Sequence, residues 1–218
     1  MNSHTTRILI TSGATLEPLD DVRYLGNRSS GKLGTLLAYA AACTGYEVTL
    51  LSGAQSIQPT AHPRLTAIPF STARDLRAKL VEHWPSHSIL IMAAAVADFT
   101  PVGGQSHGKF MRDDALTITY TQTEDIVAEL ASTSREDQRV IAFALEESAH
   151  LEERGRAKLL RKKVDAIVAN PLETMDSNEI DAVILKKDGS SVSLDGITTK
   201  AEFAHWLILH LEEILPTT

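Results

Sequence analysis

The residues best suited to chemistry in this chain follow its first apolar run, within residues 12–34. Gly13, flanked by hydroxyl residues, interrupts that run, which suits a backbone that turns sharply and leaves N–H groups free for an anion. Residues 27–31, Asn-Arg-Ser-Ser-Gly, then lead into apolar residues at helical spacing, for which Ser29 or Ser30 is the expected N-cap. A helix N-terminus beside a glycine turn favours phosphate binding.

Two common phosphate-binding motifs do not fit this stretch. Residues 26–32 match G-x-x-x-x-G-K, but Leu33 stands where a P-loop needs Ser or Thr to hold Mg²⁺. A dinucleotide fingerprint needs G-x-G-x-x-G, whereas the first apolar run is followed directly by one glycine, Gly13. The polar residues 16–26 are too many for an ordinary strand-to-helix connection, which indicates a functional loop.

Four other charged residues are candidates for binding a ligand: one at the end of a strand, one in a loop and two on a helix. Asp98 ends a predicted strand over residues 88–98, where small alanines would let a ligand approach the backbone. Lys109 belongs to a glycine-containing segment, 99–114, that we interpret as a mobile flap able to close over phosphates. Lys158 and Lys162 are four apart on a predicted helix, so their ammonium groups can meet one anion. By pattern alone the ordinary interpretations are favoured: a capping carboxylate for Asp98, a solvated loop lysine for Lys109, and a solvated basic face for Lys158 and Lys162.

The elements that position these residues alternate between strands and helices. This alternation predicts an α/β fold: a three-layer, doubly wound, mostly parallel, Rossmann-like sheet with a flap and a C-terminal hairpin. We expect one domain over residues 1–218. Strands are predicted over 7–10, 47–51, 66–70, 88–98, 116–120, 139–143 and 164–170, and the hairpin over 182–194. Helices are predicted from the N-cap serines to a stop at Gly45, and over 71–83, from 123, over 148–163 and over 200–215.

Composition narrows the function classes. The 218 residues carry a net charge of −7, which argues against nucleic acid as a partner and requires positive charge to be concentrated locally if a nucleotide is bound. Cys43 is the single cysteine, and we expect it in the core. No apolar signal or membrane-spanning segment is apparent, so the protein is expected to be soluble and cytoplasmic. The histidines show no metal-ligand spacing.

The stretch TSGATLEPLDDVRYLGNRSSGKLG resembles the phosphopantothenoylcysteine synthetase family, whose pattern runs T-[AS]-G-G-T-x-E-P-[IL]-D-x-V-R-x-[IL]-[ST]-N-x-S-[ST]-G-x-x-G. It departs from that pattern at Ala14, usually glycine, and at Gly26, usually Ser or Thr. AAVADF, GKFMR, TEDIV, IAFALE and AKLLRKKVDAIVAN follow in family order. The resemblance does not extend to the flavin-dependent decarboxylase domain that many bacterial members carry ahead of this one, so a separate decarboxylase chain is expected.

The resemblance implies a ligase of coenzyme A biosynthesis. Such an enzyme joins 4′-phosphopantothenate and L-cysteine through an acyl-nucleotide intermediate, with CTP more expected than ATP, Mg²⁺ accompanying the nucleotide, and a homodimer as the assembly. It implies catalytic roles for Asn27, as the group holding the intermediate, and for Lys109. It implies nucleotide binding by Gly13, Ala14, Ser29, Ser30, Gly31, Ala94, Ala95, Asp98, Lys109, Ala142, Phe143, Ala144, Lys158 and Lys162, and leaves the metal ligands unknown.

Two alternatives stay open at this point. A nicotinamide-dependent reductase could use the same sheet and would bind NADPH rather than CTP. A catalytically silent relative could bind nucleotide without chemistry, as the departures at Ala14, at Ala142 (usually glycine) and among the flap cations suggest.

Overall fold

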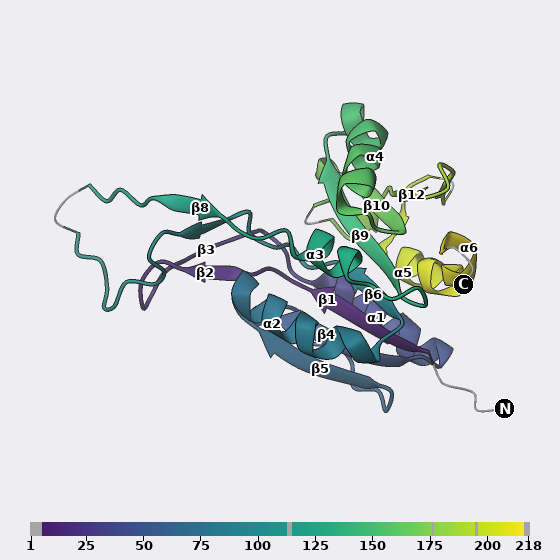
Figure 1. Ribbon diagram of the computed structural model, residues 1–218, viewed down its shortest axis with the longest axis horizontal. Coiled ribbons are helices and arrows are strands. Elements are labelled where there is room, and N and C mark those ends of the chain that lie inside the picture. Colours follow the sequence, from purple (N-terminus) through teal and green to yellow (C-terminus); the bar gives the residue numbers. More distant parts are fainter. Residues whose placement is uncertain (1–5, 113–114, 176, 195, 216–218) are drawn as a thin grey trace.

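The structure, a computed structural model, describes residues 6–112, 115–175, 177–194 and 196–215 (Figure 1). Its centre is an eight-stranded sheet with the strand order β13-β12-β10-β9-β6-β1-β4-β5. The parallel strands are β1 (Arg7–Ser12), β4 (Glu47–Gly53), β5 (Leu65–Phe70), β6 (Ile89–Met92), β9 (Arg139–Glu146) and β10 (Ala166–Pro171). The antiparallel C-terminal hairpin is β12 (Val183–Lys186) and β13 (Ser191–Ser193). The predicted mostly parallel sheet and hairpin are confirmed.

The order of the parallel strands determines where a ligand can bind. Numbered along the chain, the six parallel strands lie in the order 3-2-1-4-5-6, which is that of the doubly wound fold. The order reverses between β1 and β6. The chain leaving β1 therefore runs to β4 on one side of this pair, and the chain leaving β6 runs to β9 on the other side. Ligands bind such sheets in the crevice outside the carboxyl ends of the strands at this point.

Helices cover both faces of the sheet, which gives the expected three layers. One face carries α1 (Lys32–Thr44), α5 (Lys200–Leu209) and α6 (Leu211–Ile214), and the other carries α2 (Ala73–His83), α3 (Ile126–Ser132) and α4 (Leu151–Lys162) (Figure 1). Strand β1 shows why the run was continuously apolar: Ile8 and Ile10 contact helices on the first face, and Leu9 contacts helices on the second. The short 3₁₀ helices are η1 (Trp84–Ser86), η2 (Ser148–His150) and η3 (Leu172–Thr174).

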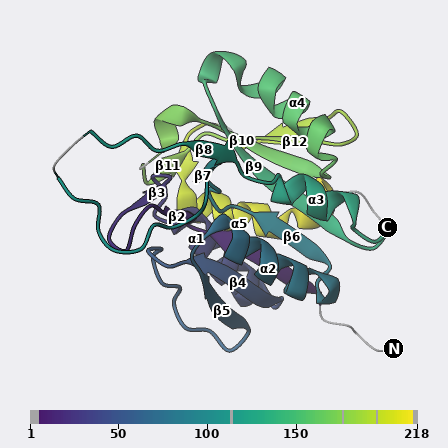
Figure 2. The same ribbon diagram turned by 60° about the vertical axis from the view of Figure 1, so that its left-hand side comes forward.

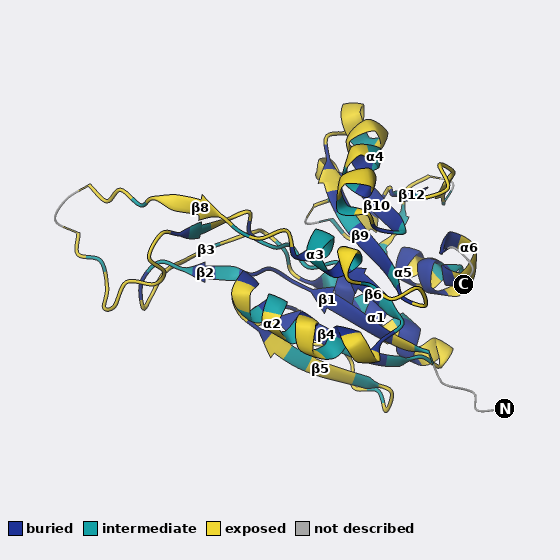
Figure 3. Ribbon diagram, in the orientation of Figure 1, coloured by how far each residue is buried: buried dark blue, intermediate teal, exposed yellow. Residues whose placement is uncertain are grey.

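Two hairpins form an arm that projects from the body of the sheet (Figures 1 and 2). They are β2 (Leu16–Pro18) with β3 (Tyr24–Gly26), and β7 (Phe99–Pro101) with β8 (Tyr120–Gln122). We call the described residues of 16–26 and 99–122 the arm, and much of its surface is exposed (Figure 3). The segment interpreted as a polar loop is therefore a hairpin, and the strand predicted over 116–120 forms only at Tyr120–Gln122. A last small pair is β11 (Glu179–Ile180) with β14 (Thr198–Thr199).

Three local predictions were wrong for physical reasons. The strand predicted over 88–98 ends at Met92, because the chain then leaves the sheet and the Ala95 N–H donates to the Gly13 carbonyl at 2.8 Å. Helix α1 has Gly31, not a serine, at its N-cap, because the chain enters the helix through a left-handed residue with φ 73°. Gly45 ends that helix as predicted, whereas Cys43 is exposed on it rather than buried.

The buried Asp20 carboxylate ties the flap to the first hairpin of the arm. Its Oδ1 accepts hydrogen bonds from the backbone N–H groups of Val22 and Arg23, at 2.8 and 2.6 Å. Its Oδ2 accepts one from the Phe110 N–H at 3.0 Å and one from the Arg23 guanidinium at 2.7 Å. These donors, the Phe110 N–H foremost, lower the pKa of Asp20 from 3.8 to about 2.

We predict that Asp20→Asn releases the Phe110 end of the flap from the hairpin, because the amide cannot accept all of these bonds. In the parent protein the attachment should be complete above pH 3.8 and weaken as the pH falls toward 2, since only the carboxylate form is stabilised. Limited proteolysis between Val102 and Met111 measures the release, with several-fold faster cleavage of the variant expected at neutral pH. Asp137→Asn, at a carboxylate paired with Arg135 outside the arm, is the control. Equal cleavage of all three proteins would contradict the prediction.

Candidate functional site

A cleft of about 750 Å³ lies at the carboxyl ends of β6, β9 and β10, beside the N-terminus of α1. This is the edge of the sheet at which the strand order predicts a ligand. The cleft brings together residues that are far apart in the sequence. Twelve predicted site residues line it: Asn27, Ser29, Ser30, Gly31, Ala94, Ala95, Asp98, Ala142, Phe143, Ala144, Lys158 and Lys162.

Residues 27–31 form one corner of the cleft, and hydrogen bonds to Val96 and Ser12 fix their position. The Asn27 side-chain amide donates to the Val96 carbonyl at 3.0 Å, which fixes its orientation. The Ser12 hydroxyl donates to the Gly31 carbonyl at 2.6 Å. A Cβ on Gly31 would lie 2.8 Å from the Ser12 oxygen, so only glycine fits this left-handed position. The corner therefore presents Asn27 and the start of α1 in a set geometry.

Gly13 and Ala14 do not line the cleft but support the alanines that do. Ala14 pairs with Ala95 in an isolated parallel bridge. Gly13 has a φ of 86°, and a Cβ on it would lie 1.7 Å from the Ser56 hydroxyl, so the turn requires glycine. Among the described residues, Lys163 is the only non-glycine with a positive φ, so the Cβ of Ala14 causes no such strain. Ala14 is therefore accommodated in this turn without backbone strain.

The cleft lining is strongly basic within an acidic chain. Among its described residues, one carboxylate, Asp98, faces six cations: Arg28, Lys32, Lys158, Arg161, Lys162 and Lys200. The chain as a whole carries −7. The local concentration of positive charge that nucleotide binding would require is therefore present. Such a lining favours an anionic ligand bearing more than one negative charge.

The two predicted helix lysines each meet a protein carboxylate. Lys158 Nζ lies 2.5 Å from Glu146 Oε1, and Lys162 Nζ lies 2.6 Å from Asp125 Oδ1. Burial raises the pKa of Asp125, but the hydrogen bonds from Lys162 and from the Ala128 N–H outweigh burial, so its pKa falls below 3.8. Asp125 is also the N-cap of α3. Both lysines are thus held at the rim of the cleft rather than extended into solvent.

Sequence reasoning missed part of the lining. Asn170 stands at the carboxyl end of β10, and its side chain donates to the Thr174 hydroxyl at 3.2 Å. Its place at the end of a parallel strand was a signal that could have identified it. Lys32 follows Gly31 directly and donates to the Asn178 side chain at 2.5 Å. Lys200, at the start of α5, carried no local signal, because only the tertiary fold brings it to the cleft.

Lys109 lies away from this cleft in its own chain. Its neighbours are bound to the first hairpin of the arm: the Gly108 N–H donates to Asp21 at 2.7 Å, and the Phe110 N–H donates to Asp20. The cleft therefore brings together the 27–31 corner and both helix lysines but not the flap lysine. The catalytic role of Lys109 stays a prediction.

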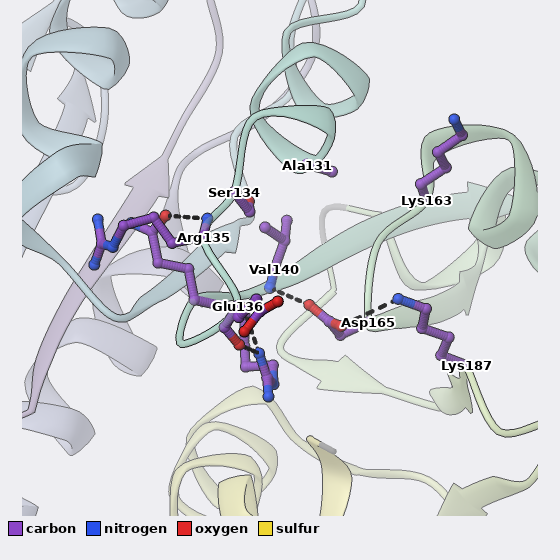
Figure 4. A pocket seen from close by; sticks show the side chains of 10 residues that line it. Ala131, Ser134, Arg135, Glu136, Val140, Lys163, Asp165 and Lys187 are labelled. Carbon is purple, nitrogen blue, oxygen red and sulfur yellow. Dashed lines mark hydrogen bonds and ion pairs between the residues drawn. The ribbon is translucent and has the colours of Figure 1, made fainter. Parts of the chain in front are cut away.

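A second cavity, of about 300 Å³, lies at the opposite edge of the sheet, near the amino ends of β9 and β10 (Figure 4). Asp165 occupies it and accepts a hydrogen bond from the Val140 N–H at 2.8 Å. Its other oxygen lies 3.8 Å from Lys187 Nζ, and the Lys163 side chain points away from the group (Figure 4). Asp165 thus joins the start of β9 to Lys187, and its contacts are explained by the structure of the sheet. We therefore take the first cleft as the candidate site.

Two features are absent from the described residues. No group of three or more His, Cys, Asp or Glu side chains there is placed to hold a metal ion. None of the helices in the described part of the chain is both long and apolar enough to span a membrane.

A mostly parallel, doubly wound sheet covered by helices on both faces defines the class of Rossmann-like α/β proteins. Within that class, residues 3–215 match the family described as DNA/pantothenate metabolism flavoprotein C-terminal domain. The chain belongs to this family, which is the phosphopantothenoylcysteine synthetase family that its motifs resemble.

Individual relatives agree with this placement. The chain is 35% identical over 202 residues to a protein of an unknown prokaryotic organism named cysteine/cysteine sulfinic acid decarboxylase, covering 91% of this chain and 55% of that protein. It is 38% identical over 189 residues to the coenzyme A biosynthesis bifunctional protein CoaBC of Vibrio cholerae, covering 84% and 47%. The DNA/pantothenate metabolism flavoprotein of Streptococcus pneumoniae superposes with a TM-score of 0.83 at 25% identity, covering 95% and 99%. The chain spans about half the length of the two curated relatives.

Proposed function

We propose that this chain is a phosphopantothenate–cysteine ligase that works in the cytoplasm. It joins 4′-phosphopantothenate to L-cysteine at the expense of CTP. The observation that carries the proposal is the cleft: six cations, the oriented Asn27 amide and the start of α1 meet at the topological switch point. A nucleoside triphosphate and a phosphorylated carboxylic acid together bring the negative charge that such a lining favours.

The chemistry proceeds in two steps. A carboxylate does not accept an amine in water at neutral pH, so one of its oxygens must first become part of a leaving group. An oxygen of the phosphopantothenate carboxylate attacks the α-phosphorus of CTP, and pyrophosphate leaves. The cysteine amine then attacks the acyl carbon of the mixed anhydride, CMP leaves with the bridging oxygen, and the nitrogen loses its proton to solvent.

The protein contributes mainly alignment and neutralisation of charge. Lys158 and Lys162 bind phosphate oxygens of the nucleotide, and the backbone N–H groups at the start of α1 bind another anionic group. Asp98 binds the ribose or otherwise positions the nucleotide, as its place in the family motif implies. Asn27, fixed by its bond to the Val96 carbonyl, hydrogen-bonds the acyl-nucleotide and stabilises the oxyanion that develops in the amine step.

Mg²⁺ accompanies the nucleotide in this proposal. The described residues hold no ready-made carboxylate cluster, which fits an ion that takes most of its oxygen ligands from substrate phosphates and water. When bound, the ion would offset triphosphate charge.

The active assembly is a homodimer formed through the arm. The arm stands away from the body of its own chain and exposes apolar side chains, among them Val22, Phe99 and Val102, exposed by 61%, 48% and 59%. Exposed apolar side chains grouped on a projecting element indicate a protein contact. A second copy bound against the arm would also bring Lys109 of one chain near the cleft of the other.

The test is product formation with each of the four nucleoside triphosphates. Purified protein is given phosphopantothenate, cysteine and Mg²⁺, and pyrophosphate and phosphopantothenoylcysteine are measured. We expect both products in equal amounts, fastest with CTP. Binding of NADPH with no response to CTP would support the reductase, and nucleotide binding without pyrophosphate release would support a silent relative. Either result would overturn the proposal.

A further inference from the structure

We propose that Glu146 and Asp125 are positioning residues of the cleft, each holding one of the two helix lysines ready for the phosphates of the nucleotide. The inference rests on the proposed function, since it concerns how that site binds its nucleotide. Neither carboxylate lines the cleft itself. They approach the lysines of α4 from two other elements, the end of β9 and the start of α3.

The Glu146 carboxylate is buried, and burying a charged group is unfavourable unless a partner compensates it. Its side chain is 7% exposed, and its partners are Lys158 at 2.5 Å and Arg154 at 3.8 Å. Among the described residues, no hydrogen bond of normal geometry reaches Glu146 Oε1, so the ion pair is what compensates its burial. The Lys158 side chain is 37% exposed, and taking the Glu146 carboxylate out of water offsets much of what such a pair contributes to stability. The pair is therefore better explained by a role for Lys158 than by stability of the strand end.

Asp125 caps helix α3 and binds Lys162, and substitutions can separate these two roles. Its Oδ1 accepts the Ala128 N–H at 3.2 Å, which caps α3, and it accepts Lys162 Nζ at 2.6 Å. Asparagine caps a helix about as well as aspartate does. The negative charge at this position consequently matters for Lys162 and is not needed for the cap.

Holding a lysine in advance favours phosphate binding for two reasons. A free lysine side chain has many rotamers, and freezing them on binding weakens affinity. An ammonium group has three N–H donors, so the one hydrogen bond from Lys162 to Asp125 leaves two donors for phosphate oxygens, and the ion pair of Lys158 with Glu146 leaves its donors available. Lys158 and Lys162, one turn apart on α4, are held from two different elements, which keeps both ammonium groups at the cleft.

The experiment compares Glu146→Gln and Asp125→Asn with the parent by calorimetric CTP binding and by steady-state kinetics. Each variant keeps the shape of the side chain and removes its charge. We expect the Kd and KM for CTP to rise roughly threefold to tenfold, the effect of freeing one long side chain, while kcat changes less than about twofold. Asp75→Asn, which removes the carboxylate paired with Lys79 on α2 outside the cleft, should leave all three values unchanged.

Asp125→Glu completes the design, because it keeps the charge and impairs the cap. CTP affinity should follow the charge, so this variant should bind CTP nearly as the parent does while its melting temperature falls. Asp125→Asn should show the reverse pattern. The inference is overturned if Asp125→Asn and Glu146→Gln, or Asp125→Asn alone where Glu146→Gln does not fold, bind CTP as tightly as the parent or more tightly. A parent protein that binds no CTP at all would overturn the proposed function, and the inference with it.

Discussion

Replacing Asn27 by alanine should slow formation of phosphopantothenoylcysteine by on the order of 10²- to 10³-fold, the usual cost of losing one oxyanion donor. The side chain is exposed at the cleft corner, and its single described bond, to the Val96 carbonyl, orients it without burying it. Its removal should therefore spare the fold. Because the amide acts in the amine step, the variant should still release pyrophosphate and should accumulate the acyl-nucleotide. Rapid-quench measurement of pyrophosphate, acyl-nucleotide and product separates the two steps.

A second variant, Asn27→Asp, tests whether the amide donor, rather than the size of the side chain, is what the amine step needs. It keeps the size of the side chain but places a carboxylate oxygen against the Val96 carbonyl and removes the amide donor. We expect it to be as slow as the alanine variant in the amine step, with CTP affinity close to that of the parent. Product formation at the parent rate in either variant would remove Asn27 from the mechanism.

Lys109→Ala should lower product formation by on the order of 10²-fold if the flap lysine neutralises charge in the transition state. Because Asp20 and Asp21 hold the flap to the first hairpin of its own arm, the lysine should act in the cleft of a partner. When the Lys109→Ala and Asn27→Ala proteins are mixed, some dimers contain one chain of each. In such a dimer one site has Asn27 from the first chain and Lys109 from the second, so it is intact, and the other site lacks both groups. With random exchange, roughly a quarter of the parent activity should return.

Two controls make this complementation decisive. Sedimentation should show a dimer, and charge on the arm surface, as in Val102→Glu, should yield monomers that lose activity and cannot be complemented. If Lys109→Ala is slow but mixing restores nothing while subunits exchange, the lysine acts in its own chain. Full activity of Lys109→Ala would show that the flap lysine has no part in the reaction.

Short-range patterns predicted the elements whose formation depends on neighbouring residues. The apolar run at Ile8–Ile10 indicated a strand buried on both faces, and helices α1 and α2, which cover it from opposite sides, show why. Alternation of strands with helices was enough to predict the layers and the parallel sheet. The motif around Asn27 and the lysine spacing on α4 predicted six of the residues that line the cleft: Asn27, Ser29, Ser30, Gly31, Lys158 and Lys162.

What escaped prediction depends on contacts between distant segments. The strand expected over residues 88–98 stops at Met92 because Ala95 pairs with the Gly13–Ala14 turn, some eighty residues earlier. The position of Lys109 depends on Asp20 accepting the Phe110 N–H across ninety residues. Lys200 reaches the cleft only because α5 lies against α1. Local propensity carries no information on such pairings.

The most direct measurement of the central claim follows an oxygen atom. Phosphopantothenate labelled with ¹⁸O in its carboxylate is converted with cysteine and CTP, and the CMP and phosphopantothenoylcysteine are examined by mass spectrometry. If the carboxylate attacks the α-phosphorus in this cleft, CMP should carry one ¹⁸O from each labelled carboxylate. Label retained entirely in the peptide product or released in inorganic phosphate would contradict an acyl-nucleotide intermediate.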